Sequence, residues 1–398
     1  MVKQVCFSCF LVVIILMAGC SSSQNGVFSV QQARENLDFA LVQYEMMHNS
    51  FTDRSVYPNC ILEDGTTRFV RPQDWTSGFY PGSLWYLYDY SGDEAFKKKA
   101  IESNAALEPI KDYTGTHDLG FMLYGSFGHG LRLGGPPAYR QILIEGAHTL
   151  ADRYNENVGC TLSWSWGERM GWKFPVIVDN MMNLEYLFWA AKETGDARFY
   201  EISVTHAETT IRHHFREDGS SYHVVDYDPD TGEVLWKGTH QGTSDDSAWA
   251  RGQAWGLYGY TLTYRETKKK AFLRQAEKIA NFLLDHPNLP ADSIPYWDFD
   301  APDIPNAPRD TSAAAIMASA LLELSTLASE PGRTKYRAAA ENILASLSSP
   351  QYRAEVGGNN YFLIKHSVGH FPRQSQIDTP INYTDYYYIE ALMRYIAR

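Results

Sequence analysis

The sequence predicts an all-α fold, an α/α six-hairpin toroid with a minor β-hairpin, in which an outer ring of helices surrounds an inner ring. Two observations support this prediction. Apolar helical segments end at four turn-like sites, and each is followed by a second amphipathic segment that carries an aromatic residue. The turns lie at residues 90–93, 193–196, 265–268 and 329–332, and the aromatic residues are Phe96, Phe199, Phe272 and Tyr336.

The first helix of each pair shows a clear helical period. Ala250, Ala254 and Leu257 recur at helical spacing, and several such segments are apolar on both faces, as expected of inner helices. Six starts of this kind imply six hairpins. They fall near Ser77, Asp118, Asp179, Ser247, Thr311 and Thr384.

The remaining outer helix is predicted at residues 30–48, where it would pair with the last inner helix and close the ring. The toroid then occupies residues 28–398 as a single domain. Two separate helical domains are the competing layout, but no Ser-, Gly- and Pro-rich linker divides the chain. Strand content should be small, with one hairpin at residues 222–236 around the turn at 228–232.

The first residues predict export. Lys3 precedes an apolar run at residues 11–16, and Cys20 follows a small-residue stretch and precedes three serines. We interpret residues 1–19 as a lipoprotein signal peptide, Cys20 as the lipidated residue and residues 20–27 as a short tether. An ordinary secretory signal is the alternative. The first interpretation predicts a bacterial cell-envelope lipoprotein whose only membrane contact is the lipid, since no later stretch is long and apolar enough to span a bilayer.

Charge and spacing exclude several functions. The chain has 398 residues and a formal net charge of −12, which argues against nucleic-acid binding. No spacing of His, Cys, Asp or Glu matches a metal motif, and no phosphate-binding glycine loop is present, so we expect no cofactor. Cys60 and Cys160 lie beyond the signal and either pair or stay free.

Polar and aromatic residues gather where the inner helices are predicted to begin. In a ring of parallel inner helices these starts share one end, so residues far apart in sequence converge there. A helix N-terminus also favours anions. This end carries Trp75, His117, Asp118, Asp179, Asn180, Asp245, Asp246, Trp249 and Arg251.

Asp118 and Asp179 are candidate catalytic carboxylates. Either one is also explained as an N-cap, which stabilises a helix by about 1 kcal/mol. Asp179, however, follows the apolar residues 175–178, where desolvation would raise its pKa towards that of a general acid. The helix dipole opposes this rise, and a neighbouring Asp118 would support it. Paired carboxylates of this kind are typical of sugar-cleaving sites.

Residues 238–255 contain the highest concentration of side chains that could bind or react with a ligand. Gln241, Trp249 and Arg251 lie close to one helix start, and Arg251 offers a fork for a carboxylate. Trp255 is nearly two turns further on and is explained equally well by core packing. We expect Asp245 and Asp246 to be caps or ion-pair partners of Arg251. His223 falls on the predicted hairpin, where a lone histidine is usually structural.

Six segments of the sequence resemble motifs of a known enzyme family. Residues 75–82, 117–122, 179–184, 244–255, 366–370 and 385–387 resemble the unsaturated glucuronyl hydrolases, glycoside hydrolase family 88. The resemblance covers nearly all of the chain after the signal. It implies an α/α six-hairpin barrel without a metal. It also implies an enzyme that removes the 4,5-unsaturated uronic acid left by polysaccharide lyases at the non-reducing end of oligosaccharides.

The resemblance also implies a role for each site residue. Asp179 matches the acid and base that protonates C4 and helps water add at C5, and Asp118 matches the carboxylate that holds the ring hydroxyls and keeps Asp179 protonated. His223, Gln241, Arg251 and Trp255 match residues that contact the unsaturated sugar, while Trp75 and Trp249 match pocket aromatics. His117, which precedes Asp118 in the same motif, is expected to bind the substrate, and the loop with Lys365, His366 and Ser367 matches the region that meets the next sugar.

Two alternatives stay open from the sequence. The related unsaturated rhamnogalacturonyl hydrolases have a similar barrel but take a pectin-derived substrate, and the context of His117 and Asp118 favours the glucuronyl group. A non-catalytic glycan-binding surface lipoprotein is the alternative from a different class. It would lack paired carboxylates at a closed pocket.

Overall fold

The computed structural model describes residues 28–397. The predicted signal peptide at residues 1–19, the predicted lipidation site Cys20 and the tether at residues 20–27 lie outside the described residues. Within residues 28–397, no helix is both long and apolar enough to cross a membrane.

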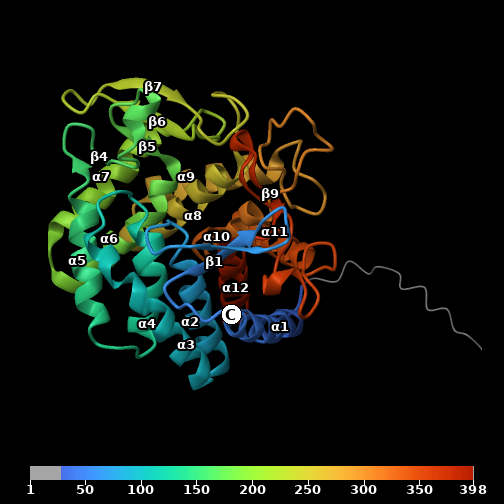
Figure 1. Cartoon of the computed structure of the whole chain (residues 1–398). Helices are drawn as coiled ribbons and strands as arrows, with labels where there is room; N and C mark the ends of the chain where they lie inside the picture. Colours follow the sequence, from blue (N-terminus) through green and yellow to red (C-terminus); the bar gives the residue numbers. More distant parts are fainter. Residues whose placement is uncertain (1–27, 398) are drawn as a thin grey trace, which may run out of the picture.

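The predicted toroid is confirmed: inner and outer helices alternate along the chain around one ring (Figure 1). The inner positions are taken by α2 (Phe79–Ser91), η2 with α4 (Gly120–Gly128 and His129–Arg132), η4 with α6 (Val178–Asn183 and Leu184–Thr194), α8 (Ala250–Thr267), α10 (Thr311–Leu327) and α12 (Asn382–Ile396). The outer positions are taken by α1 (Val30–Asn49), α3 (Glu94–Asn104), α5 (Tyr139–Ala151), α7 (Ala197–His214), α9 (Lys270–Asp285) and α11 (Gly332–Leu347). Short 3-10 helices are η1 (Ala105–Asp112), η3 (Gly167–Met170), η5 (Asn359–Tyr361) and η6 (Phe371–Arg373).

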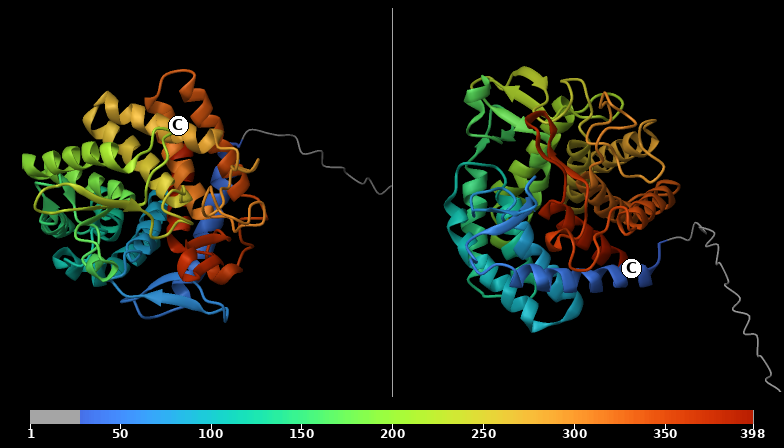
Figure 2. Two further views of the ribbon diagram at one scale, coloured as in Figure 1. Left: turned by 90° about the horizontal axis from the view of Figure 1, so that it is seen from above. Right: turned by 45° about the vertical axis from the view of Figure 1, so that its right-hand side comes forward.

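The ring closes as predicted. Each inner helix packs against the next one along the chain, and α12 packs back against α2. Helix α1 lies along the outside of α12, and the Tyr395 hydroxyl donates a hydrogen bond to the Phe28 carbonyl (Figure 2). The first and last helices are thereby joined, so the toroid has no open edge.

The turns between inner and outer helices explain why the turn residues in the sequence predicted the helix boundaries. Gly92 and Gly195 end α2 and α6 in the left-handed conformation, with φ of 68° and 76°, which glycine adopts without a steric penalty. The next residues, Asp93 and Asp196, cap the following outer helices by accepting a backbone N–H two residues on. A glycine stop followed by an aspartate start is therefore one hairpin signal.

Two inner positions depart from the α-helix that periodicity predicts. The second begins as a π-helix, η2, and the third begins as a 3-10 helix, η4. π-Helical geometry is rare and is often found at functional sites. Both irregular segments begin at the end of the ring that carries the candidate carboxylates.

The structure has more strand than the single predicted hairpin. That hairpin is β6 (Val224–Tyr227) with β7 (Val234–Gly238), and β5 (Pro175–Ile177) joins it as a third strand. Three more two-stranded sheets are formed by β1 (Tyr57–Ile61) with β2 (Thr67–Val70), β3 (Tyr154–Asn155) with β4 (Cys160–Thr161), and β8 (Ser367–His370) with β9 (Ser375–Thr379). Strands of two to five residues are too short to show an alternating pattern, so the sequence did not predict them.

An aromatic partition divides the lumen of the barrel. It is formed by Phe79, Phe121, Trp255 and Tyr387, all buried. The ring centroids of Phe121 lie 5.5 Å from Phe79 and 5.2 Å from Trp255, and Trp255 lies 5.3 Å from Tyr387. Two of these contacts are tilted and the one between Trp255 and Tyr387 is edge-to-face, and aromatic pairs at these distances stabilise a core. The candidate carboxylates lie on one side of the partition.

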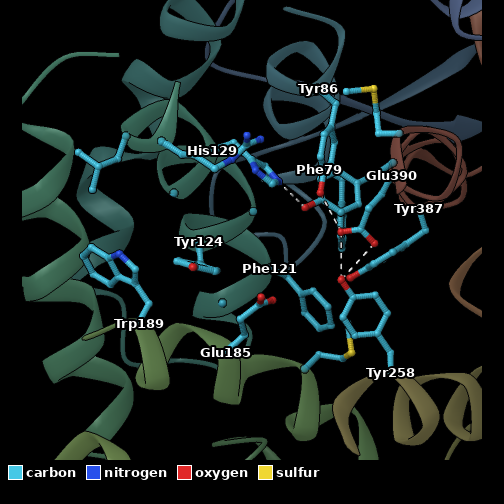
Figure 3. A pocket seen from close by; sticks show the side chains of 18 of the residues that line it. Phe79, Tyr86, Phe121, Tyr124, His129, Glu185, Trp189, Tyr258, Tyr387 and Glu390 are labelled. Carbon is cyan, nitrogen blue, oxygen red and sulfur yellow. Dashed lines mark hydrogen bonds between the residues drawn. The ribbon is translucent and has the colours of Figure 1, made fainter. Parts of the chain in front are cut away.

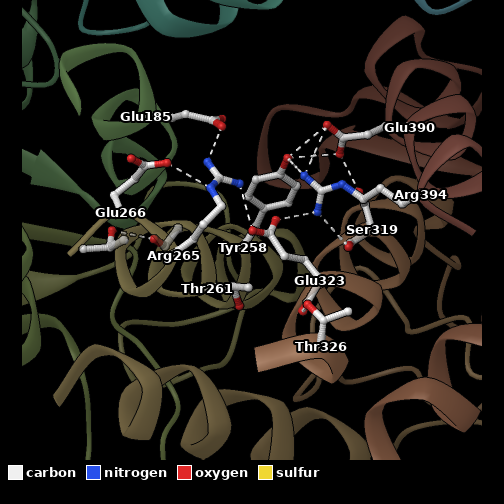
Figure 4. Close-up of polar contacts among 12 residues, drawn as sticks. Glu185, Tyr258, Thr261, Arg265, Glu266, Ser319, Glu323, Thr326, Glu390 and Arg394 are labelled. Carbon is white, nitrogen blue, oxygen red and sulfur yellow. Dashed lines mark hydrogen bonds and ion pairs between the residues drawn. The ribbon is translucent and has the colours of Figure 1, made fainter. Parts of the chain in front are cut away.

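A second cavity of about 560 Å³ lies on the other side and is lined by residues of α2, η2, α4, η4, α6, α8 and α12 (Figure 3). The charged groups that line it pair with one another or with residues just outside the lining. Arg394 pairs with Glu323 at 2.8 Å, and Glu390 accepts the hydroxyls of Tyr86 and Tyr258. Arg265 pairs with Glu185, Glu266 and Glu323 (Figure 4). We assign this network a structural role.

Candidate active site

A pocket of about 450 Å³ opens at the end of the ring where the inner helices begin. Six of the predicted site residues line it: Trp75, His117, Asp118, Asp179, Gln241 and Arg251. Three others stand directly behind this lining: His223, Trp249 and Trp255. Although the second cavity is larger, both candidate catalytic carboxylates are in this pocket.

Asp179 lies at the start of η4, directly after β5. Its side chain is buried, and burial raises the pKa of its carboxyl to about 7. The positive charge of Arg251 opposes this rise, and the negative charge of Asp118 supports it. Within residues 28–397 the Asp179 Oδ2 atom has no hydrogen-bond partner. The carboxyl therefore suits a group that holds a proton near neutral pH.

Asp118 lies in the segment before η2 and is also buried. The Thr116 hydroxyl donates a hydrogen bond to its Oδ2 atom. The Nε2 atom of His117 lies 3.3 Å from its other oxygen, Oδ1. Neither candidate carboxylate is an N-cap, because Leu119 holds that position for η2 and Ile177 holds it for η4.

His223 sits behind Asp179, with its Nε2 atom 3.6 Å from the Asp179 Oδ2 atom. Its Nδ1 atom accepts the backbone N–H groups of His240 and Gln241 at 3.3 and 3.2 Å. Burial lowers the pKa of His223 well below its usual value, so the ring is neutral. The strand position alone favoured a structural role, but the structure brings this histidine against a carboxylate.

Arg251 is buried, and its partner differs from the one we expected. Its guanidinium lies 3.2 Å from Asp310 and donates to the carbonyls of Val368 and Gly369. Asp245 and Asp246 are not its partners. Asp245 accepts the backbone N–H of Thr239 at 3.0 Å.

The expected ion pair does not form because the Arg251 side chain extends away from residues 245 and 246. Arg251 lies in the first turn of α8 and reaches the loop that leads into α12, whereas Asp245 and Asp246 lie on an exposed turn before α8. Sequence proximity favoured the wrong carboxylates, because the right one belongs to the next inner helix.

The three predicted tryptophans have different surroundings. Trp75 lines the pocket and packs 5.0 Å from Tyr383. Trp249 supports two site residues, with ring contacts of 4.4 Å to His223 and 4.6 Å to the Arg251 guanidinium. Trp255 belongs to the aromatic partition, and its side chain also helps to lower the pKa of Asp179. Core packing and contact with the site are thus combined in Trp255.

Several pocket residues were missed by the sequence analysis. Trp164 and Trp166 line the pocket as stacked indoles 4.6 Å apart, together with His240, His370 and Arg373. The spacing of Trp164 and Trp166 could have identified them as pocket residues, because two tryptophans one residue apart in a non-helical segment are an uncommon pattern for core packing. Their convergence with residues 240 and 370–373 depends on long-range folding.

Two expectations about cysteines and metals can be compared with the structure. Cys60 and Cys160 are both free and buried, so they do not pair. Within residues 28–397 no group of three or more His, Cys, Asp and Glu side chains is placed to hold a metal ion.

Known proteins share this chain's sequence and fold, although no family model matches it. The chain is 44% identical to an unsaturated glucuronyl hydrolase of Formosa agariphila over 88% of this chain and 89% of that protein. It is 33% identical to an unsaturated chondroitin disaccharide hydrolase of Streptococcus pyogenes serotype M1 over 92% of each. The crystal structure of an unsaturated glucuronyl hydrolase specific for heparin is 49% identical, with a TM-score of 0.89 and coverage of 92% of this chain and 97% of that one. This chain therefore belongs to the unsaturated glucuronyl hydrolases of glycoside hydrolase family 88.

Proposed function

We propose that this enzyme removes the 4,5-unsaturated uronic acid from the non-reducing end of lyase-generated oligosaccharides by hydrating the C4=C5 double bond. The observation that carries the proposal is the pair of unlike carboxyl groups in one pocket. Asp179 is buried with a pKa of about 7, and the nearby negative charge of Asp118 helps to keep it protonated. A buried carboxyl group that keeps its proton near neutral pH beside a second carboxylate is a common arrangement for acid and base catalysis.

The proposed chemistry uses one carboxyl group twice, first as an acid and then as a base. Asp179 transfers its proton to C4 of the vinyl ether, which leaves positive charge shared between C5 and the ring oxygen. The Asp179 carboxylate then takes a proton from a water molecule, and the resulting hydroxide adds at C5. The hemiketal so formed opens and releases the remaining sugar. Displacement at the anomeric carbon is not involved, so the carboxylate separation does not report retention or inversion.

Recognition of the uronate must be local, because the chain carries a formal net charge of −12. Arg251 supplies a cation on the pocket wall, and the inner helices direct their N-terminal N–H groups towards the same end. We assign Asp118, His117 and Gln241 to the unsaturated sugar and Trp75 to its apolar face, while His223 stands behind this lining and acts on the sugar through Asp179. Trp249 and Trp255 support these residues from behind.

We propose a heparin-derived unsaturated disaccharide as the preferred substrate. The support is similarity: the relative whose structure is described as specific for heparin is 49% identical. A relative from Streptococcus agalactiae, described as a variant complexed with dGlcA-GalNAc6S, is 29% identical. The stacked Trp164 and Trp166 beside the pocket offer an apolar wall to the second sugar.

The test is a panel of unsaturated oligosaccharides from heparin, chondroitin and rhamnogalacturonan, with loss of the enoate absorbance as the readout. We expect the highest kcat/KM on the heparin disaccharide. A preference for chondroitin would overturn the heparin proposal alone. Activity confined to the rhamnogalacturonan product would overturn the glucuronyl assignment, and binding without turnover of any member would favour a glycan-binding protein.

We also propose that Cys20 is lipidated and anchors the enzyme in the cell envelope. The support is the order of basic residue, apolar run, small residues and cysteine at the start of the chain. Wild-type protein should partition into the detergent phase, and Cys20→Ser should not, while Cys9→Ser serves as the matched control. Wild-type protein in the aqueous phase with a mature N-terminus elsewhere would favour an ordinary secretory signal.

A further inference from the structure

Asn183 is a buried residue that joins the segments carrying the two candidate carboxylates. It ends η4, one turn after Asp179, and is 1% exposed without lining the pocket. Its Oδ1 atom accepts the backbone N–H of Gly120 at 2.9 Å, two residues after Asp118. This contact fixes which way the amide points, because only its oxygen can accept that hydrogen.

The orientation of Asn183 determines the hydrogen position on His117. The Asn183 Nδ2 atom lies 3.4 Å from the His117 Nδ1 atom, and an amide nitrogen only donates. His117 Nδ1 must therefore accept, so the hydrogen of the neutral ring lies on Nε2. That atom is 3.3 Å from the Asp118 Oδ1 atom. The N–H of this second nitrogen therefore lies beside the carboxylate, although it makes no hydrogen bond to it within residues 28–397.

The contact between Gly120 and Asn183 leaves no room for a side chain at residue 120. A Cβ atom at residue 120 would lie 2.5 Å from the Asn183 Oδ1 atom and 3.0 Å from its Cα atom. Glycine at this position lets the start of η2 approach η4 closely enough for the amide to reach both Gly120 and His117. The close approach is therefore a property of the two segments together.

His223 has the same arrangement beside Asp179. Its Nδ1 atom accepts two backbone N–H groups, so its hydrogen lies on Nε2, which faces the Asp179 Oδ2 atom at 3.6 Å. Each candidate carboxylate thus has the Nε2 atom of a histidine close by, at 3.3 Å for Asp118 and 3.6 Å for Asp179, with no hydrogen bond between them in the described residues. At His223 the backbone fixes the tautomer, whereas at His117 a replaceable side chain does.

We propose that Asn183 is a positioning residue that holds His117 as its Nε2–H tautomer, so that an N–H and not a ring lone pair lies beside the Asp118 carboxylate. This inference rests on the roles proposed above for Asp118 and Asp179. The charged and titratable groups that face His117 are Asp118, Arg153 and His206. With the other tautomer, a ring lone pair would lie beside the negative charge of Asp118, which is the charge that supports the protonation of Asp179.

Two variants separate this role from simple packing. Asn183→Asp keeps the acceptor for Gly120 but removes the donor to His117, whereas Asn183→Leu removes both. Asn104→Asp and Asn104→Leu, at a buried asparagine outside the pocket lining, are matched controls for burying a charge or an apolar group. Melting temperature, kcat/KM per folded enzyme and the ¹⁵N signals of the histidine rings are measured for each protein.

We expect wild-type His117 to carry its hydrogen on Nε2 in the resting enzyme, a result that does not depend on any substrate. Both Asn183 variants should lower kcat/KM by about ten- to a hundredfold, and the basic limb of the Asn183→Leu pH profile should move to lower pH. Asn183→Asp should also place a hydrogen on His117 Nδ1. A wild-type hydrogen on Nδ1, or normal kinetics of folded Asn183→Asp, would overturn the proposal. Failure of the hydrolase reaction itself would leave the tautomer result unchanged.

Discussion

Replacing Asp179 with Asn should stabilise the enzyme at alkaline pH while removing its activity. Burial raises the carboxyl pKa from 3.8 to about 7, a shift of about three pH units. One unit corresponds to about 1.4 kcal/mol, so the folded protein bears an unfavourable free energy of at most about 4 kcal/mol when Asp179 is ionised. An amide of the same shape bears none of it.

The sign follows from the proton balance. Because the pKa is raised in the folded state, the folded protein binds the proton more tightly than the unfolded chain. Stability from this group is fully present below about pH 4 and is lost as the pH rises through about 7. The amide introduced by Asp179→Asn does not titrate, so the variant and the wild type should diverge over this window.

The assay compares melting temperatures of wild type and Asp179→Asn at acidic and alkaline pH, with Asp246→Asn, at an exposed carboxylate, as the control. We expect the variant to gain stability relative to wild type only at alkaline pH. Its turnover should fall by about 10² to 10⁴, while substrate binding persists. The reasoning is refuted if the melting difference does not change with pH, or if the folded variant keeps near-normal turnover.

Three further predictions concern metals, thiols and the second cavity. EDTA should leave activity unchanged because the described residues offer no metal-ligand cluster, and a rate restored by one divalent ion would contradict this. A reductant should leave the melting temperature unchanged and thiol reagents should react only after unfolding, since Cys60 and Cys160 are free and buried; fast labelling of folded enzyme would argue otherwise. Glu390→Gln should cost about 1 to 3 kcal/mol of stability by weakening bonds to Tyr86, Tyr258 and Arg394, with kinetics of the folded enzyme unchanged. Altered kinetics would link the second cavity to the reaction.

The fold was predictable because its signals are local. A glycine stop and an aspartate start are adjacent at Gly92 and Asp93, and the apolar period of α8 spans a single segment. Short strands such as β3 and β4 carry no comparable pattern, because two residues cannot show a period. The π-helix η2 was missed because its apolar residues have nearly the same spacing as those of an α-helix.

The candidate site was predictable where its residues precede inner helices. Asp118, Asp179 and Arg251 all lie near helix starts, and a ring places those starts together. What lies around them was not predictable in the same way. The approach of Trp164 to the pocket and the amide link from Asn183 to His117 depend on how loops and neighbouring helices pack.

Because Arg251 pairs with Asp310, the expected effect of Arg251→Ala on stability differs from the one that the sequence suggested. Had Arg251 paired with the exposed turn at residues 245–246, Arg251→Ala would report either on stability or on binding. Its actual partner, Asp310, is buried, so removing the guanidinium leaves a carboxylate with no cation at 3.2 Å. The remaining bonds from Ser312 and Val368 to Asp310 only partly compensate. Loss of stability is therefore expected whatever the role of Arg251 in binding.

Asp310→Asn separates the two effects. This variant removes the ion pair but leaves Arg251 held by the carbonyls of Val368 and Gly369 on the pocket wall. A charge-assisted hydrogen bond is worth roughly 1.5 to 3 kcal/mol, so Arg251→Ala should lower kcat/KM by about one to two powers of ten. Both variants should melt at lower temperature, but only Arg251→Ala should lose kcat/KM to this extent. If the two variants lose stability alike and neither changes the kinetics of the folded enzyme, Arg251 supports the loop before α12 and does not bind the uronate.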